Sequence, residues 1–172
     1  ETGLGGLEIV GRITAMGLLC GVFGINVAHE LGHRATKYEQ FLAKSLLLTS
    51  LYMHFYIEHN RGHHKNVSTP ADPSSARKNE ALQLFWLRSV FGAYKSAWHL
   101  ENARLRRKKQ PVFGLQKEKL IFTMVQLAML LTVFLLFGAA VLLWFFLAAV
   151  FGFLLLETVN YIEHYGLARH KV

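Results

Sequence analysis

The 172-residue sequence has little cysteine and little charge, and both scarcities exclude classes of protein. Its single cysteine, Cys20, has no partner for an internal disulfide, which excludes a secreted domain held by disulfides. Charged residues make up only 17% of the chain, whereas 52% of the residues are hydrophobic. A soluble domain normally carries more charge than this. The composition therefore favours a membrane protein.

The charges that are present are mostly basic, and the formal net charge is +8 at pH 7. Nucleic-acid binding would explain a basic excess but not long apolar runs, so we expect no nucleic-acid partner. In membrane proteins, basic residues gather in loops on the cytoplasmic side. The basic cluster from Arg104 to Lys109 therefore predicts the cytoplasmic face. Docking of an acidic electron carrier is a second, less favoured role for this cluster.

Long apolar stretches give the expected helices. Residues 120–156 contain no charged residue, and as one helix they would measure about 55 Å, nearly twice the hydrocarbon thickness of a bilayer. We therefore predict two transmembrane helices joined by a tight turn near Gly138. The complete set of expected helices comprises transmembrane segments over about 7–28, 120–137 and 139–158, and an interfacial helix over about 41–57.

The stretch over 41–57 is assigned to the interface because of its neighbours. One group of histidines precedes it and another follows it. If both groups serve one site, the helix between them cannot cross the membrane. The sequence thus predicts an all-α integral membrane helical bundle with its histidines clustered on the cytoplasmic side. The segment from Pro70 to Ser75 is a predicted loop, since its two prolines stop helix propagation.

The first histidine group is the string from His29 to His33, with Glu30 between them. On a helix, residues four apart lie on one face, so both imidazoles could reach one metal ion. The string also satisfies the His-Glu-x-x-His pattern of zinc proteases, although the other histidine groups make a protease a poor account of the whole chain. For this pair alone, two interfacial histidines without a metal are an equally good interpretation.

The second group is denser: Glu58-His59-Asn60-Arg61-Gly62-His63-His64. His59 and His63 are again four apart. His64 would point about 100° away from His63 on a helix, so these two could serve different metals. Such a density of histidine is unusual for a solvated surface, and we predict metal binding here.

The third group, from Asn160 to His164, lies at the end of the predicted membrane hairpin. Histidine and carboxylates are costly at a membrane helix end unless they are paired or functional. An interfacial cap is the alternative role.

Other polar residues are expected beside the metal. Metal-bound imidazoles usually need a partner for their outer nitrogen, and the candidates are Asp72, Glu157 and Glu163. For Asp72, a salt bridge to an arginine is the alternative. His54 is expected to support or pack near the ligands. His99 and His170 are interpreted as structural or surface residues.

Imidazole donors exclude calcium and magnesium, which prefer oxygen. They suit iron, zinc, copper and nickel, and the residues themselves leave the choice open.

Four strings together resemble bacterial membrane-bound alkane monooxygenases, members of the fatty acid desaturase and hydroxylase superfamily. They are the three histidine groups, the last extended through Tyr165-Gly166, and Thr69-Pro70-Ala71-Asp72-Pro73. The resemblance covers nearly the whole chain in the family's order. The Asn160–Gly166 string is the most specific, because related desaturases have histidine boxes but not this one.

The resemblance implies a function and a set of ligands. It implies terminal hydroxylation of medium- or long-chain n-alkanes to 1-alkanols with O2 at two iron ions. The electrons would come from rubredoxin, which rubredoxin reductase reduces. It implies a multi-pass protein among the lipids of the bacterial cytoplasmic membrane, with the active site facing the cytoplasm. The metal ligands it implies are His29, His33, His59, His63, His64 and His164.

The resemblance also implies a further His-x-x-His-His group downstream of Gly166 and helices before residue 1. We therefore expect residues 1–172 to be a single membrane di-iron domain, incomplete at both ends and inactive alone. Two alternatives remain: another membrane di-iron enzyme, such as a xylene-type hydroxylase or fatty-acyl desaturase, and a membrane metal-binding protein without enzymatic activity. The latter would place ligands across the bilayer midplane.

Overall fold

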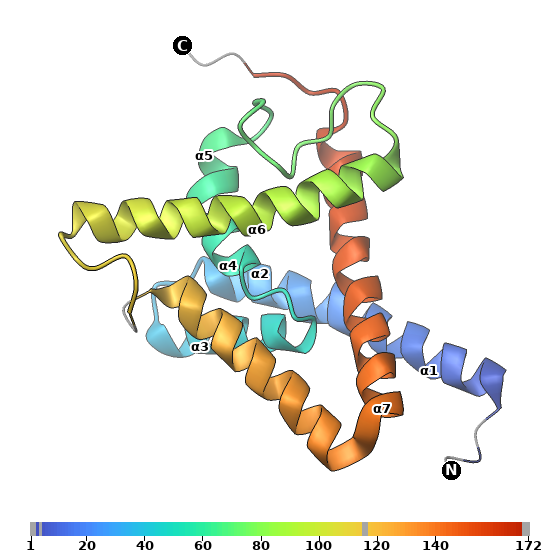
Figure 1. Cartoon of the computed structure of the whole chain (residues 1–172). Coiled ribbons are helices and arrows are strands. Elements are labelled where there is room, and N and C mark those ends of the chain that lie inside the picture. Colours follow the sequence, from blue (N-terminus) through green and yellow to red (C-terminus); the bar gives the residue numbers. More distant parts are fainter. Residues whose placement is uncertain (1–2, 4, 115–116, 170–172) are drawn as a thin grey trace. The chain divides into compact units, whose positions relative to one another are not determined.

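The computed structural model describes residues 3, 5–114 and 117–169, and all regular elements in these ranges are helices (Figure 1). The expected all-α class is confirmed. The chain divides into two compact units, which we describe separately. Unit 1 holds the described residues of Glu1–Tyr52 together with Val125–Leu156, and unit 2 holds those of Met53–Met124 and Glu157–Val172.

The first long helix of unit 1 is built from three consecutive elements. They are α1 (Gly6–Leu18), the π-helix η1 (Leu19–Ile25) and α2 (Asn26–Gly32). Together they form 27 helical residues, or about 40 Å at 1.5 Å per residue, which is long enough to cross a bilayer. A helix is therefore present where a membrane span was predicted over 7–28.

The longest helix, α7 (Glu118–His164), is interrupted at Gly138, where φ is 81° and ψ is 177°. Glycine adopts this backbone conformation at little cost because it has no Cβ. The break lies where the sequence predicts a turn, and Figure 1 shows α7 reversing its direction. Only 17% of the most apolar window of α7 is buried, so most of its apolar surface requires a non-aqueous surrounding. This exposure favours a membrane location for the helix.

Within unit 1, small residues allow α1 and η1 to pack closely against the part of α7 that follows Gly138, its second arm. A Cβ added to Gly21 would lie only 2.6 Å from the carbonyl oxygen of Gly152. A Cβ on Gly17 would lie 2.6 Å from Cδ1 of Phe151. Such contacts between small residues are typical of helix packing in membranes, where backbones approach closely.

The helix α3 (Lys37–Thr49) ends earlier than the continuous helix predicted over 41–57. The amides of Leu51 and Tyr52 donate to the carbonyls of Leu48 and Leu47, both at 3.0 Å, and Leu51 has a φ of 52°. This pair of hydrogen bonds is the Schellman arrangement that terminates helices.

A second helix, α4 (Phe55–Glu58), begins after this turn. The turn buries the side chain of Tyr52, whose ring stacks on Phe153 at a centroid distance of 4.9 Å. Burial of this aromatic ring accounts for two helices in place of one.

Unit 2 begins with α4, the π-helix η2 (His59–His63) and α5 (His64–Asn66), which are continuous. A loop containing both predicted loop prolines follows and leads into α6 (Leu82–Arg107). The buried side of α6 recurs every four residues and comprises Phe85, Ser89, Ala93, Ala97, Glu101 and Leu105. The turn that carries His59, His63 and His64 packs against this face.

Candidate metal centre

In unit 1, α2 brings His29 and His33 together as their spacing predicts. Their Nε2 atoms lie 3.2 Å apart, and the rings meet edge to face. Nδ1 of His29 lies 3.4 Å from the carboxylate of Glu30. Burial, together with the adjacent His29, lowers the pKa of His33, which favours the neutral imidazole that a metal requires.

In unit 2, the histidine pairing differs from the prediction. Residues 59–63 form a π-helix rather than an α-helix. In this wider turn, the residue five positions on comes back over the first, so His59 faces His64, with Nε2 atoms 3.0 Å apart. The expected α-helical geometry of this turn is therefore wrong, but His59 and His63 do lie together, with their rings stacked at a centroid distance of 5.2 Å. The predicted divergence of His63 from His64 is present.

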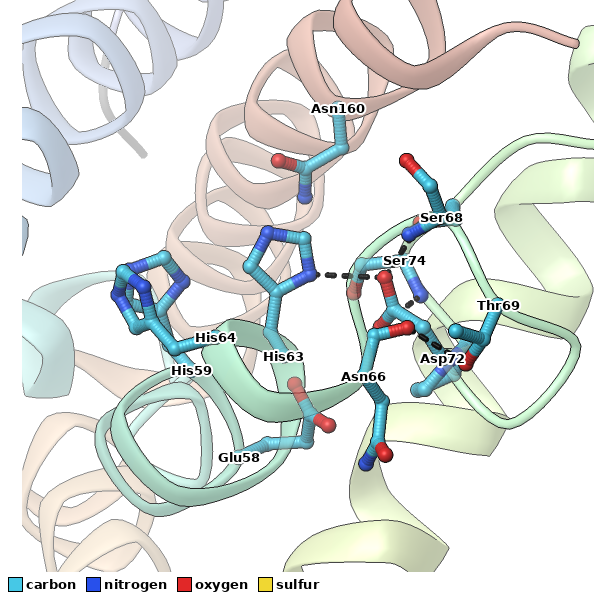
Figure 2. A network of polar contacts seen from close by, with 12 residues as sticks. Glu58, His59, His63, His64, Asn66, Ser68, Thr69, Asp72, Ser74 and Asn160 are labelled. Atoms are coloured by element: carbon cyan, nitrogen blue, oxygen red, sulfur yellow. Dashed lines mark hydrogen bonds and ion pairs between the residues drawn. The ribbon is translucent and has the colours of Figure 1, made fainter. Parts of the chain in front are cut away.

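His63 points instead toward the predicted loop. Its Nδ1 lies 2.9 Å from Oδ2 of Asp72, a contact visible in Figure 2, where Asn160 lies above the ring. Its ring centroid is 5.0 Å from that of His164. Burial lowers the pKa of His63, but the hydrogen bond and charge of Asp72 outweigh burial and raise it overall. The carboxylate contact predicted for Asp72 is thus present. It engages Nδ1 of His63 and leaves Nε2 as the ring nitrogen that could bind a metal.

Asp72 is itself fixed by its neighbours. It is buried and accepts hydrogen bonds from the Ser75 hydroxyl and the backbone amide of Ser74. The segment after α7 holds the same loop, because the amide of Gly166 donates to the carbonyl of Ala76 at 3.2 Å. The strings around Asp72 and Gly166, far apart in sequence, therefore contact each other within unit 2.

The donor atoms fit a transition metal in two respects. Two imidazole nitrogens bound at about 2.1 Å and at a right angle to each other are about 3.0 Å apart. The facing Nε2 pairs, at 3.2 Å for His29 and His33 and 3.0 Å for His59 and His64, match this separation. The Nδ1 atom of His164 is buried without a hydrogen-bond partner, and a buried polar atom of this kind normally has one. Metal coordination would satisfy all three sets of atoms.

The contacts on the other face of the histidine turn (residues 59–64) were not predicted from the sequence. Glu58 is only 2% exposed, and it accepts a hydrogen bond from Ser96 of α6 at 3.2 Å. Burial, and then the charge of Asp72, raises the pKa of Glu58 to about 7. Gly62 leaves room for this carboxylate, since a Cβ there would lie 2.3 Å from its Oε1.

Arg61 also anchors the turn, through Glu101, which was not predicted. A sequence signal for Glu101 does exist. It occupies a position in the apolar four-residue repeat of α6, where a carboxylate is not expected without a partner.

The remaining predicted residues occupy varied positions. Glu157 is buried and accepts hydrogen bonds from the Ser89 hydroxyl and the Asn160 amide. Glu163 is exposed.

His54 packs edge to face on Tyr94, and burial, followed by the charge of Lys119, lowers its pKa to about 3. It is therefore neutral at physiological pH. His99 is exposed, and His170 lies outside the described residues.

Residues 9–172 match the family model described as fatty acid desaturase. The chain belongs to this family. Among its curated relatives, alkane 1-monooxygenase 1 of Alcanivorax borkumensis is 40% identical over 98% of this chain and 42% of its own length. Alkane 1-monooxygenase 1 of Pseudomonas aeruginosa is 42% identical over 97% of this chain and 44% of its own length. The xylene/toluene monooxygenase hydroxylase component XylM of Pseudomonas putida is more distant, at 29% identity.

The chain thus spans about two fifths of the length of the curated alkane 1-monooxygenases that it matches. Family membership and the two long apolar helices together identify a membrane protein. The grouped histidines and the family of the chain both point to metal binding.

Proposed function

We propose that this chain carries metal ligands of a membrane alkane 1-monooxygenase, which converts n-alkanes of medium or long chain length to 1-alkanols. The observation that carries the proposal is that imidazole nitrogens lie in pairs at the distance expected for two ligands of one metal ion. The relatives of this chain, at about 40% identity, are named alkane 1-monooxygenases. The reaction inserts one oxygen atom of O2 into a terminal C–H bond. The other oxygen leaves as water, with two electrons and two protons supplied from outside the substrate.

We further propose that two iron ions are bound, and that bound iron supplies the oxygen chemistry. Imidazole donors suit iron but do not select it over zinc or copper, so the choice of iron rests on the family resemblance. The proposed ligands are His29, His33, His59, His63, His64 and His164.

The protein's own residues orient these ligands. Asp72 accepts from Nδ1 of His63, which fixes the tautomer and leaves Nε2 as the nitrogen of that ring that would hold the metal. Ser74 and Ser75 hold Asp72 in turn. In other metal proteins, loss of a residue that hydrogen-bonds to a metal ligand typically lowers metal affinity or activity by about 10- to 100-fold.

The alkane enters from the bilayer in this proposal, because its favourable transfer into hydrocarbon concentrates it there. Unit 1 contains an apolar pocket of about 210 Å³, lined by side chains of α1 and of the second arm of α7, including Met16, Trp144 and Phe145. We propose that it forms part of the path for the hydrocarbon.

Rubredoxin, re-reduced by its reductase, is the proposed electron donor, and the cytoplasmic face of the bacterial inner membrane the proposed side of the site. The basic cluster at the end of α6 supports this orientation, since Arg106, Arg107 and Lys108 are exposed and unit 2 also contains the histidine turn. The family resemblance supplies the identity of the donor.

The test uses the full-length protein, expressed in membranes with a rubredoxin and its reductase and supplied with octane. Products are separated by gas chromatography with mass detection. We expect 1-octanol. Absence of any alcohol, with iron bound at about two per chain, would move the assignment to another hydrocarbon, such as a methyl-substituted aromatic, or to acyl desaturation, each tested with its own substrate.

His63→Ala in the same protein tests the ligand assignment. We expect iron content and octanol formation to fall together, because Nε2 of His63 is a proposed ligand atom. His99→Ala is the matched control, since His99 is an exposed histidine of the same unit. Unchanged iron and turnover in the His63 variant would overturn the ligand assignment.

A further inference from the structure

The histidine turn of unit 2 has two distinct faces. One face carries the imidazoles of His59 and His64, which point toward each other. The opposite face is held against α6 by Glu58, through Ser96, and by Arg61. Nothing in the proposed metal chemistry uses Arg61, yet it lies in the middle of the turn that carries three proposed ligands.

Arg61 makes two charged contacts with different helices. Its NH1 donates to Oε2 of Glu101 in α6 at 2.8 Å, and its NH2 donates to Oε2 of Glu118, at the start of α7, also at 2.8 Å. The side chain of Arg61 is 35% exposed, whereas that of Glu101 is fully buried. This pair therefore differs from the exposed ion pairs that contribute little to protein structure.

Glu101 is a hub with every acceptor position in use. Besides Arg61, it accepts from Nε and NH2 of Arg104 at 2.9 and 2.5 Å, and from the backbone amide of Glu118 at 2.9 Å. These partners hold the Glu101 carboxylate in one place and lower its pKa in spite of burial, so it remains charged. A fixed carboxylate makes a rigid point of attachment for the guanidinium of Arg61.

The attachment matters because the turn has two available geometries. A π-helical turn is rare and occurs mostly as a single widened turn within an α-helix, which is the ordinary geometry. In an α-helix His59 would align with His63, and His64 would point about 100° away from that face. The backbone must therefore be held in the wider turn for Nε2 of His59 to meet Nε2 of His64.

We propose that Arg61 is a positioning residue of the metal centre: by joining the histidine turn to Glu101 and Glu118, it holds the π-helical geometry in which His59 and His64 offer their Nε2 atoms together. This inference rests on the proposed metal-binding function. It assigns to Arg61 no contact with the metal or the substrate. Lysine cannot replace it fully, because an ammonium group lacks the planar fork that reaches two carboxylates at once.

The experiment measures binding of Co²⁺ to the full-length protein, purified in detergent and freed of iron, by its visible absorption bands. These bands report the arrangement of ligands around the ion, which loss of stability alone does not change. We expect Arg61→Gln to weaken Co²⁺ binding by roughly 10- to 100-fold, as removal of other outer partners does, and to shift the bands. Arg61→Lys should give an intermediate affinity.

Arg104→Gln is the matched control. It removes an arginine from the same carboxylate, but the hydrogen bonds of Arg104 to Glu101 lie within α6. We expect wild-type affinity and bands in this variant. In the metal-free protein, amide hydrogen exchange of residues 59–64 should rise in Arg61→Gln and stay unchanged in Arg104→Gln.

The outcomes separate this inference from the function on which it rests. His59→Ala and His64→Ala must lose the cobalt bands; if they keep them, the proposed metal site fails and the inference falls with it. If they lose the bands while Arg61→Gln keeps wild-type affinity and spectrum, the role of Arg61 is refuted. Equal losses in the Arg61 and Arg104 variants would also refute it. If Arg61→Gln does not fold, Arg61→Lys decides, and a wild-type spectrum there overturns the proposal.

Discussion

Substitution of Gly21 by alanine should destabilise unit 1 by forcing apart the close crossing of η1 and α7. The added Cβ would lie 2.6 Å from the carbonyl oxygen and 2.9 Å from Cα of Gly152. An ordinary close approach of carbon to a carbonyl oxygen is about 3.3 Å, so the helices must separate by roughly 0.7 Å. Both obstructing atoms belong to the backbone, and no side-chain rotation relieves the overlap. Overpacking of this kind costs about 1–3 kcal/mol.

Two further glycines calibrate the measurement. Gly11 is in the same long helix, and a Cβ there meets nothing within 4 Å. Both changes gain a similar intrinsic helix preference, about 1 kcal/mol for alanine over glycine, so their difference isolates the crossing. On Gly152 a Cβ would approach the Gly17 carbonyl oxygen and the Gly21 amide nitrogen, each at 3.2 Å, which is tighter than usual but milder.

The assay is unfolding of the full-length protein in mixed micelles as the fraction of sodium dodecyl sulfate is raised. We expect the free energy of unfolding of Gly21→Ala to fall below that of Gly11→Ala by about 1–3 kcal/mol, with Gly152→Ala between them. Equal stability of the Gly21 and Gly11 variants would refute the close crossing of the two helices.

Two other changes test unit 2 by the same unfolding measurement. Gly62→Ala should cost about 1–3 kcal/mol, because its Cβ would lie 2.3 Å from Oε1 of the buried Glu58 and 2.9 Å from Cδ1 of Leu100, and the cost should fall in a Glu58→Ala background, where only the milder overlap with Leu100 remains. An undiminished cost in that background would place the obstruction elsewhere. Glu80→Gln should cost on the order of 1.5–3 kcal/mol at pH 7, since Glu80 accepts two charge-assisted hydrogen bonds from Arg88. The hydrogen bond with Arg88 lowers the pKa of Glu80 in the folded protein, so its stabilisation is complete above the ordinary glutamate pKa and is lost as the pH falls through the lowered value. The Glu80→Gln variant should therefore approach wild-type stability in acid, and a difference independent of pH would exclude this ion pair as its source.

The apolar runs and the glycine between them determine the long helices of this chain. The uncharged run over 120–156 is too long for one membrane crossing, and Gly138 is a residue that can take the positive φ of a reversal. Both arguments are local, and the structure places the break at Gly138. The candidate ligands are also predictable from local sequence, since strings this rich in histidine are recognised without knowledge of any tertiary contact.

The end of α3 was not predictable from the same information. Residues 41–57 remain apolar through the turn at Leu51, which has no glycine or proline to mark it. The helix ends there because Tyr52 is buried against Phe153, a residue distant in sequence. A pattern of hydrophobic residues reports that a segment is buried, but it does not report which neighbour covers it.

The pairing of the ligands depends on tertiary structure for a related reason. The sequence alone specifies three histidines and an α-helical spacing that aligns His59 with His63. Contacts of the opposite face of the turn, through Glu58 and Arg61, accompany a π-helix in which Nε2 of His59 also meets Nε2 of His64. Because π-helical turns are rare, the spacing of the histidines favours the α-helix, and the wider turn is found only in the folded structure. The sequence by itself determined which side chains are the candidate ligands and that they lie in a membrane helical protein. Only the tertiary structure decided which imidazoles face each other, because that depends on contacts between distant segments, such as Arg61 with Glu118, 57 positions further along the chain.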